Sequence, residues 1–348
     1  MNKNLKNVLK TLLFLGIGTI ILYVVYLKFN SDFHKECEVL GTAPEDCNFF
    51  ETIVDYIKSA DYLWVIIALA FYLLSNVSRS IRWMMLLEPL SHKPKFLNAF
   101  STVMVGYLVN LGIPRSGEFV RAGLLARHEK MEPEKVMGTI VTSRVIDVIC
   151  LLIAIGLTLL LSFDKFVNYF KNEVNLSDKF GGLISPLILS ILGFVFIGIG
   201  ILIWKNRAKI LATKIGQKIK KIGLGFWEGI ISIKNLKRPF AFIFHTIVIW
   251  VCYYLMTYLM FFSFEPVANL EPVSGLVVFV FGTLGIVIPS PGGMGTYQYL
   301  ISEALMLYGV AFPEAFAFSN IMFFTVQIVN VLLGVVAFIF LPIYNRNV

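Results

Sequence analysis

Charged side chains are scarce in this sequence. Asp, Glu, Lys and Arg make up 15% of its 348 residues, whereas hydrophobic residues make up 57%. Soluble globular domains carry about 25% charged residues. The shortage therefore excludes an ordinary water-soluble domain and indicates a chain that folds in a lipid bilayer.

Motifs for catalysis and for nucleotide hydrolysis are also absent. The sequence has no G-x-x-x-x-G-K-[ST] phosphate loop and no H-E-x-x-H zinc motif, and its four histidines are scattered. No nucleophile and base stand together in a recognisable pattern. We therefore expect a protein that is not an enzyme, with no metal and no cofactor.

What the sequence does have is long apolar blocks. Each is near or above the ~20 residues that an α-helix needs to cross a bilayer, and they cover residues 8–27, 62–87, 136–161, 183–204, 240–264 and 315–341. Ten-residue alternating segments typical of a membrane barrel are missing. The blocks predict an all-α polytopic membrane protein with about six full spans, in a single membrane domain over residues 1–348. We interpret the first block as an uncleaved signal anchor.

The net charge of +8 is concentrated in one loop. Residues 205–238 contain ten Lys and Arg residues and one acid, Glu228. The positive-inside bias predicts that this loop is cytoplasmic, with attraction to anionic inner-leaflet lipid as an addition. Nucleic acid is not expected as a partner, because no soluble basic domain is present.

The termini follow the same bias. Lys3, Lys6 and Lys10 place the N-terminus inside the cell, and Arg346 places the C-terminus inside as well. We therefore expect a multi-pass protein of the cell (inner) membrane with both termini in the cytoplasm.

Residues 31–60 then form an external loop. Cys37 and Cys47 in this loop are candidates for a disulfide in an oxidising compartment. Metal binding is the alternative, but His34 is the one further ligand nearby, and no complete set forms.

Two apolar segments are interrupted by Pro and Gly. The first break reads GIPRSG at residues 112–117, and the second reads PSPGGMG at residues 289–295. The halves on either side are short for a full crossing, so we interpret both segments as re-entrant hairpins. Ten full spans are the alternative, and the positions of the termini do not separate the two.

The placement of charged residues and the repeated order of segments indicate a duplication. Each hairpin is followed by a Pro-Glu helix start, Pro133-Glu134 and Pro313-Glu314, and then by a long span. Basic residues at both ends predict that the first hairpin enters from the cytoplasm, and parity then predicts that the second enters from outside. This predicts an inverted-topology repeat, with one unit at 96–162 and the other at 273–341.

Three motifs together resemble one known family. They are NLGIPRSGEFVRAG at residues 110–123, SRVID at 143–147 and PSPGGMG at 289–295. In this order they resemble the lysylphosphatidylglycerol synthase transmembrane (flippase-like) family. In multidomain members the membrane part moves an aminoacylated phospholipid between leaflets. This chain is similar to a stand-alone membrane unit without the synthase domain, since it ends soon after its last span.

The resemblance implies a flippase or translocator. Its partner would be a membrane phospholipid or another lipid phosphate, including a polyisoprenoid one, whose headgroup moves between leaflets. A membrane transferase or a non-transporting accessory protein in lipid or envelope-glycan synthesis is the alternative. Many relatives carry a basic residue early in the last span, where this chain has MFFTVQ at residues 322–327.

The first hairpin and the span after it hold the charged site candidates. Arg115, beside the exposed start of a half-helix, is suited to a lipid phosphate. Glu118 and Arg121 either line the site or pair with each other at i, i+3, and Asn110 either lines the site or caps the turn. Arg144 and Asp147 also have i, i+3 spacing, which predicts a structural pair with Arg144 facing the site.

The second hairpin is nearly uncharged. Its candidates are Pro291, Gly292, Gly293, Gly295, Gln298 and Glu303. The glycines permit close approach of the backbone to a ligand, and they equally favour tight helix packing in lipid. Glu303 is either a carrier of a coupling proton or, as we prefer, a hydrogen-bond partner of a neighbouring helix.

Overall fold

A computed structural model describes residues 58–90, 93–113, 115–163, 231–288, 290 and 293–346, together with residues 23, 48, 51, 55, 224 and 227. The predictions for the blocks at 8–27 and 183–204, for Cys37 and Cys47, for Pro291 and Gly292, and for most of the loop at 205–238 lie outside these residues. Within them every regular element is a helix.

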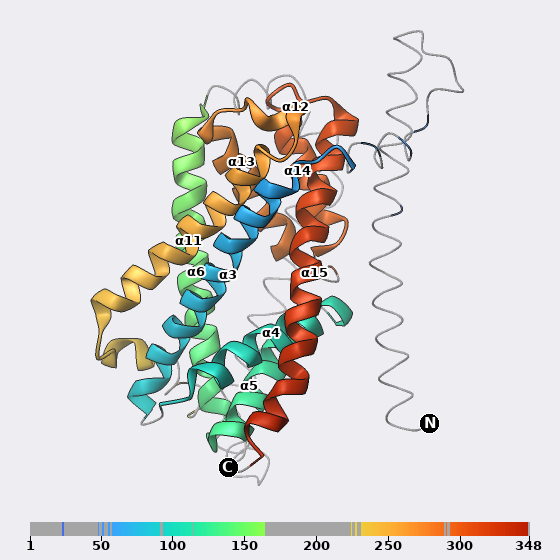
Figure 1. Cartoon of the computed structure of the whole chain (residues 1–348). Coiled ribbons are helices and arrows are strands. Elements are labelled where there is room, and N and C mark those ends of the chain that lie inside the picture. Colours follow the sequence, from blue (N-terminus) through green and yellow to red (C-terminus); the bar gives the residue numbers. More distant parts are fainter. Residues whose placement is uncertain are drawn as a thin grey trace, which may run out of the picture.

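The main helices are α3 (Tyr62–Leu87), α4 (Phe96–Gly112), α5 (Gly117–Glu129), α6 (Pro133–Leu161), α11 (Pro239–Phe261), α13 (Pro272–Val287), α14 (Thr296–Met306) and α15 (Phe312–Tyr344). Short turns of helix are η1 (Glu88–Leu90), η2 (Ser232–Asn235) and α12 (Glu265–Ala268). Figure 1 shows them as one elongated bundle.

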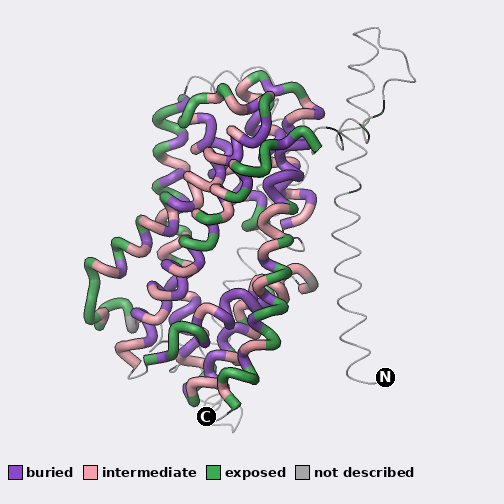
Figure 2. The backbone as a smooth tube through the Cα atoms, in the orientation of Figure 1, coloured by how far each residue is buried: buried purple, intermediate pink, exposed green. Residues whose placement is uncertain are grey.

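Four of the described helices are long and apolar enough to cross a membrane: Tyr62–Leu90, Pro133–Leu161, Pro239–Phe261 and Phe312–Tyr344. They correspond to four of the six predicted spans. Large apolar side chains on them remain exposed, among them Phe244, Leu152 and Val336. In Figure 2 exposed positions, coloured green, recur along these helices. Apolar side chains on the outside of a bundle suit contact with lipid tails.

Local sequence explains where the helices begin. Proline occupies the first or second position of α6, α11, α13 and α15, where its missing N–H costs no hydrogen bond. The two predicted Pro-Glu starts, at Pro133 and Pro313, are thus confirmed as helix starts. Helix α3 has no proline there, and the Asp61 side chain caps it by accepting from Leu63 N–H.

Both predicted breaks separate two short helices that pack on each other, α4 on α5 and α13 on α14. Helix α4 has 17 residues and α13 has 16, which gives each a length of about 25 Å. In Figure 1 the α4–α5 pair lies near the end of the bundle where the chain terminates, and α13 and α14 lie toward the other end.

Glycine residues, which have no side chain, allow the two helices of each pair to pack tightly. A Cβ on Gly117 would lie 2.0 Å from the carbonyl oxygen of Gly106, and a Cβ on Gly285 would lie 2.7 Å from Cα of Tyr297. Both distances are far below van der Waals contact, so only glycine fits at either position.

The long helix after each short pair also contacts the other pair. Helix α6 packs on α5 and on α13, while α15 packs on α14 and on α4. The helices before the pairs, α3 and α11, pack on each other. The two halves of the described chain are therefore interlocked.

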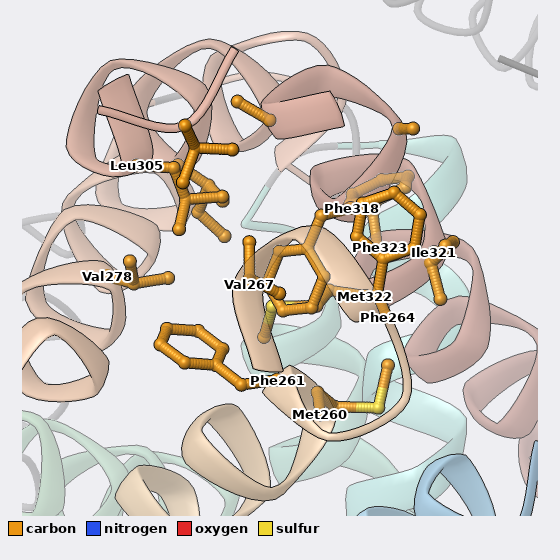
Figure 3. Packing of buried hydrophobic residues seen from close by; sticks show 14 of the residues in the cluster. Met260, Phe261, Phe264, Val267, Val278, Leu305, Phe318, Ile321, Met322 and Phe323 are labelled. Carbon is orange, nitrogen blue, oxygen red and sulfur yellow. The ribbon is translucent and has the colours of Figure 1, made fainter. Parts of the chain in front are cut away.

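The apolar core has a cluster at each end. One joins α3, α11, α13, α14 and α15 around Phe318, whose ring contacts those of Phe261 and Phe264 (Figure 3). The other joins α3 to α4, α5 and α6 around Trp83 and Met104. The charged groups described next lie beside the second cluster.

Candidate functional site

Four arginines and two acids gather where α3, α5 and α6 meet. We call this group the arginine cluster, and its members are Arg79, Arg82, Glu118, Arg121, Arg144 and Asp147. Arg79 lies about 12 Å from the end of α3, and Arg144 lies about 16 Å from the start of α6, at 1.5 Å per residue. Both are therefore well inside helices of membrane-spanning length.

Asp147 is the centre of the ion pairs. Its carboxylate accepts from Arg82 Nη2 at 2.6 Å and from Arg79 Nη1 at 3.3 Å, and Arg144 Nη1 lies 3.6 Å away. The predicted Arg144–Asp147 pair is present, but it is the longest of the three. The carboxylate thus ties α3 to α6.

Polar side chains also bind the two α3 arginines. Arg82 is fully buried and donates to Ser143 Oγ at 2.8 Å. Arg79 donates to the Tyr253 hydroxyl of α11 at 2.9 Å. These bonds hold both guanidinium groups in fixed positions, as buried charges require.

Glu118 accepts from Arg144 Nε at 2.5 Å. This contact joins α5 to α6 across 26 residues of sequence. The i, i+3 pairing of Glu118 with Arg121, one of two alternatives from the sequence, is replaced by this longer-range pair. The acid is held by the helix that follows it.

Arg121 instead stacks on an aromatic ring. Its guanidinium carbon lies 3.6 Å from the centroid of the Trp83 ring, a cation–π arrangement. The side chain is buried, and its Nε and Nη2 find no hydrogen-bond acceptor among the described residues. A buried guanidinium with unused donors is unusual in a folded protein.

Arg115 occupies the turn between α4 and α5. It has a positive φ of 60° and an exposed side chain, and its Nη2 donates to the carbonyl oxygen of Val287 at 2.8 Å. Val287 is the last residue of α13. The turn of the first short pair therefore contacts the end of the first helix of the second pair.

Side-chain amides cap both turns. Asn110 Oδ1 accepts from the N–H of Gly117, the first residue of α5, and Gln298 Oε1 accepts from the N–H of Gly295, which precedes α14. Of the two roles open to Asn110, capping is the one observed. Gln298 is fully buried, and its Nε2 has no partner among the described residues.

Glycine conformation shapes the second turn. Gly293 and Gly295 both have positive φ, 85° and 83°, which glycine adopts without strain. Glu303 lies partly buried on α14. The described residues contain no group of three or more His, Cys, Asp and Glu that could hold a metal ion.

Comparison with protein families now adds to this geometry. The family described as the lysylphosphatidylglycerol synthase TM region matches residues 49–334. The chain belongs to this family. Comparisons with curated proteins and with solved structures find no match. Membership confirms the resemblance stated above and identifies a membrane protein linked to lipid handling.

The last span has no basic residue at positions 322–327. Met322 and Phe323 there are buried in the apolar core around α15. The arginine cluster is built by α3, α5 and α6 and requires no basic residue from α15.

Sequence reasoning missed Arg79 and Arg82. No site role is predicted for either residue within the apolar block at 62–87, whereas the structure buries both inside α3. A signal was available, because two arginines three residues apart inside an apolar block indicate a functional site by default. Of the predicted candidates, the structure brings Glu118, Arg121, Arg144 and Asp147 together.

Proposed function

We propose that this protein moves the phosphate-bearing headgroup of a membrane lipid between leaflets. The arginine cluster would hold the headgroup while the acyl chains stay in lipid. No chemical step is proposed, so the protein would act as a translocator rather than an enzyme.

The observation that carries the proposal is the arginine cluster itself. Arginines inside membrane-spanning helices are costly, and those that occur mark substrate or ion pathways. A guanidinium presents donors in a fork that matches two phosphate oxygens. Because the family is linked to lipid handling, a lipid phosphate is the natural ligand of such a group.

The proposed architecture is an inverted repeat in the inner membrane, with six spans and two re-entrant hairpins. Hairpin α4–α5 would enter from the cytoplasm and α13–α14 from outside, with both termini cytoplasmic. Their positions toward opposite ends of the bundle (Figure 1) support this arrangement. The Arg115–Val287 bond, which joins the turn of the first hairpin to the end of α13, supports hairpins that meet inside the membrane.

Two such hairpins suggest alternating access. Separation of α4–α5 from its neighbours would open the cluster to one leaflet, and separation of α13–α14 would open it to the other. The helices shared by both hairpins, α6 and α15, would remain the fixed part.

The test is lipid movement in reconstituted vesicles. Purified protein is placed in liposomes with acyl-labelled fluorescent phosphatidic acid, phosphatidylglycerol or phosphatidylethanolamine, and a membrane-impermeant quencher bleaches the outer leaflet. We expect protein-dependent bleaching of the inner-leaflet pool for at least one lipid. A pool that stays protected for every lipid would overturn the proposal.

Matched arginine variants locate the site. Arg82→Gln removes a buried member of the cluster and is expected to stop movement. Arg127→Gln changes an exposed arginine in the last turn of α5 and is expected to leave movement unchanged. Equal rates for both variants would place the pathway elsewhere.

A further inference from the structure

The arginine cluster has more positive than negative charge. Arg79, Arg82, Arg121 and Arg144 supply four positive charges, and Glu118 and Asp147 supply two negative ones. Among the described residues, two positive charges remain without a counter-ion. A surplus of this kind in a medium of low dielectric requires a partner of opposite sign.

Nearby acids are engaged elsewhere. Glu88, just beyond α3, accepts from Arg238 at 2.6 Å, and Glu129, at the end of α5, accepts from Asn98 at 2.7 Å. The predicted spans at 8–27 and 183–204 contain no Asp or Glu. These parts of the protein therefore offer no further carboxylate to balance the cluster.

Unused donors accompany the surplus charge. The Nε atoms of Arg79, Arg82 and Arg121, and Nη2 of Arg121, are buried and have no acceptor among the described residues. Arg121 is 6% exposed, and both Arg79 and Arg144 lie within electrostatic range of it. Acceptor oxygens from a ligand would satisfy the N–H groups of Arg121.

The cluster is open on one side. The side chain of Arg144 is 41% exposed and that of Glu118 is 26% exposed, whereas Arg82 is 0% exposed. A ligand can therefore reach the cluster past Arg144 and Glu118, while Asp147 and the α3 arginines form its closed inner side.

We infer that the arginine cluster selects a headgroup with two negative charges, a phosphate monoester or a diphosphate. A monoester carries about −1.5 to −2 at pH 7 and offers three acceptor oxygens. A phosphodiester headgroup carries one negative charge and leaves part of the surplus unbalanced. An aminoacylated headgroup with a net positive charge is repelled. This inference rests on the proposed function, because it names the substrate of the same site.

Binding in detergent tests the inference apart from transport. The thermal unfolding of the purified full chain is followed at pH 8 with short-chain phosphatidic acid, with phosphatidylglycerol of the same chains, with its lysyl ester, and with inorganic phosphate. We expect phosphatidic acid to stabilise the protein at about tenfold lower concentration than phosphatidylglycerol, and the lysyl ester to have no effect. Equal half-effective concentrations for the first two lipids would overturn the inference.

Inorganic phosphate distinguishes a lipid phosphate from a free phosphate, since both present the same dianionic group. If phosphatidic acid binds far more tightly than phosphate, the ligand is a lipid. If phosphate binds as tightly, the preference for a dianion stands and a soluble phosphate is its source.

Charge-changing variants give the decisive comparison. Arg121→Gln lowers the surplus to one and is expected to remove the tenfold preference, whereas Arg127→Gln on the same helix keeps it. Glu118→Gln raises the surplus to three and is expected to strengthen the preference. It serves as the second test if Arg121→Gln fails to fold. Unchanged preferences in both cluster variants would refute the assignment.

The two proposals fail separately. Movement of lipids in vesicles without any preference in binding would overturn the dianion inference and leave the translocator standing. A binding preference for phosphatidic acid without movement of any lipid would overturn the translocator and leave the dianion inference standing.

Discussion

The two short helix pairs, α4–α5 and α13–α14, use the same local devices for different ends. Each pair packs through a glycine that admits no Cβ, and each turn is capped by a side-chain amide. The first pair adds Glu118 and Arg121 to a charged cluster, whereas the second adds a buried glutamine and the partly buried Glu303. The comparison teaches that the backbone form of these pairs is independent of the charges they carry.

The largest expected effect comes from the arginine cluster, to which the first helix pair contributes. Asp147→Asn removes the carboxylate shared by three guanidinium groups and is expected to lower the free energy of unfolding by about 3–5 kcal/mol, because it leaves buried charges unpaired. Denaturant unfolding in detergent micelles measures it.

The control for this variant is Glu132→Gln, which changes an exposed acid just before α6. A loss for Asp147→Asn no greater than that of the control would mean that Asp147 does not balance the cluster.

Packing in the two pairs is compared next. Gly117→Ala places a Cβ 2.0 Å from a carbonyl oxygen, and Gly285→Ala places one 2.7 Å from a backbone carbon. Both are expected to destabilise by about 1–3 kcal/mol through overpacking, with the first the more severe. The unfolding free energies of the two variants are measured side by side.

Gly123→Ala controls for the change of residue, because nothing lies within 4 Å of a Cβ there. It is expected to be stabilising, since alanine favours a helix. If Gly285→Ala costs more than Gly117→Ala, the ranking of the two contacts is wrong.

The amide caps are expected to contribute less. Asn110→Ala leaves the Gly117 N–H without its acceptor and is expected to cost about 1 kcal/mol. Gln298→Ala removes the equivalent bond to Gly295 and leaves a space in the core, so its cost is expected to be larger. Thermal unfolding of both variants tests this order, and a larger loss for Asn110→Ala would contradict it.

The contact between the two pairs is expected to show the smallest effect on stability. Arg115→Gly and Arg115→Ala both lose the bond to Val287, but glycine also relieves the positive φ, so the glycine variant is expected to be about 1 kcal/mol more stable than the alanine one. Unfolding of the two variants measures this difference. Equal stability would show that the turn relaxes once the bond is gone.

Much of the helical framework follows from local sequence. Apolar length predicts the four described spans, and Pro133 and Pro313 predict two of their starts. The breaks follow from proline and glycine, which interrupt a helix wherever the chain places them. These features depend on backbone geometry within a few residues.

The ion-pair partners within the arginine cluster were not predictable from local sequence. Spacing suggested Glu118 with Arg121 and Arg144 with Asp147, because i, i+3 neighbours are the pairs that a sequence shows. The structure joins Glu118 to Arg144 and Asp147 to Arg82 and Arg79. These pairs cross between helices, and the packing of α3, α5 and α6 decides which of them can form.

Composition and residue order thus determine that this chain is helical, lies in the membrane and is interrupted twice, because each property is local or additive along the chain. The arrangement of the helices determines that arginines from α3 and α6 share two carboxylates, and that Arg121 of α5 keeps unused donors. In a low dielectric, charges must pair wherever helix packing brings them together, and no spacing along one helix reveals that.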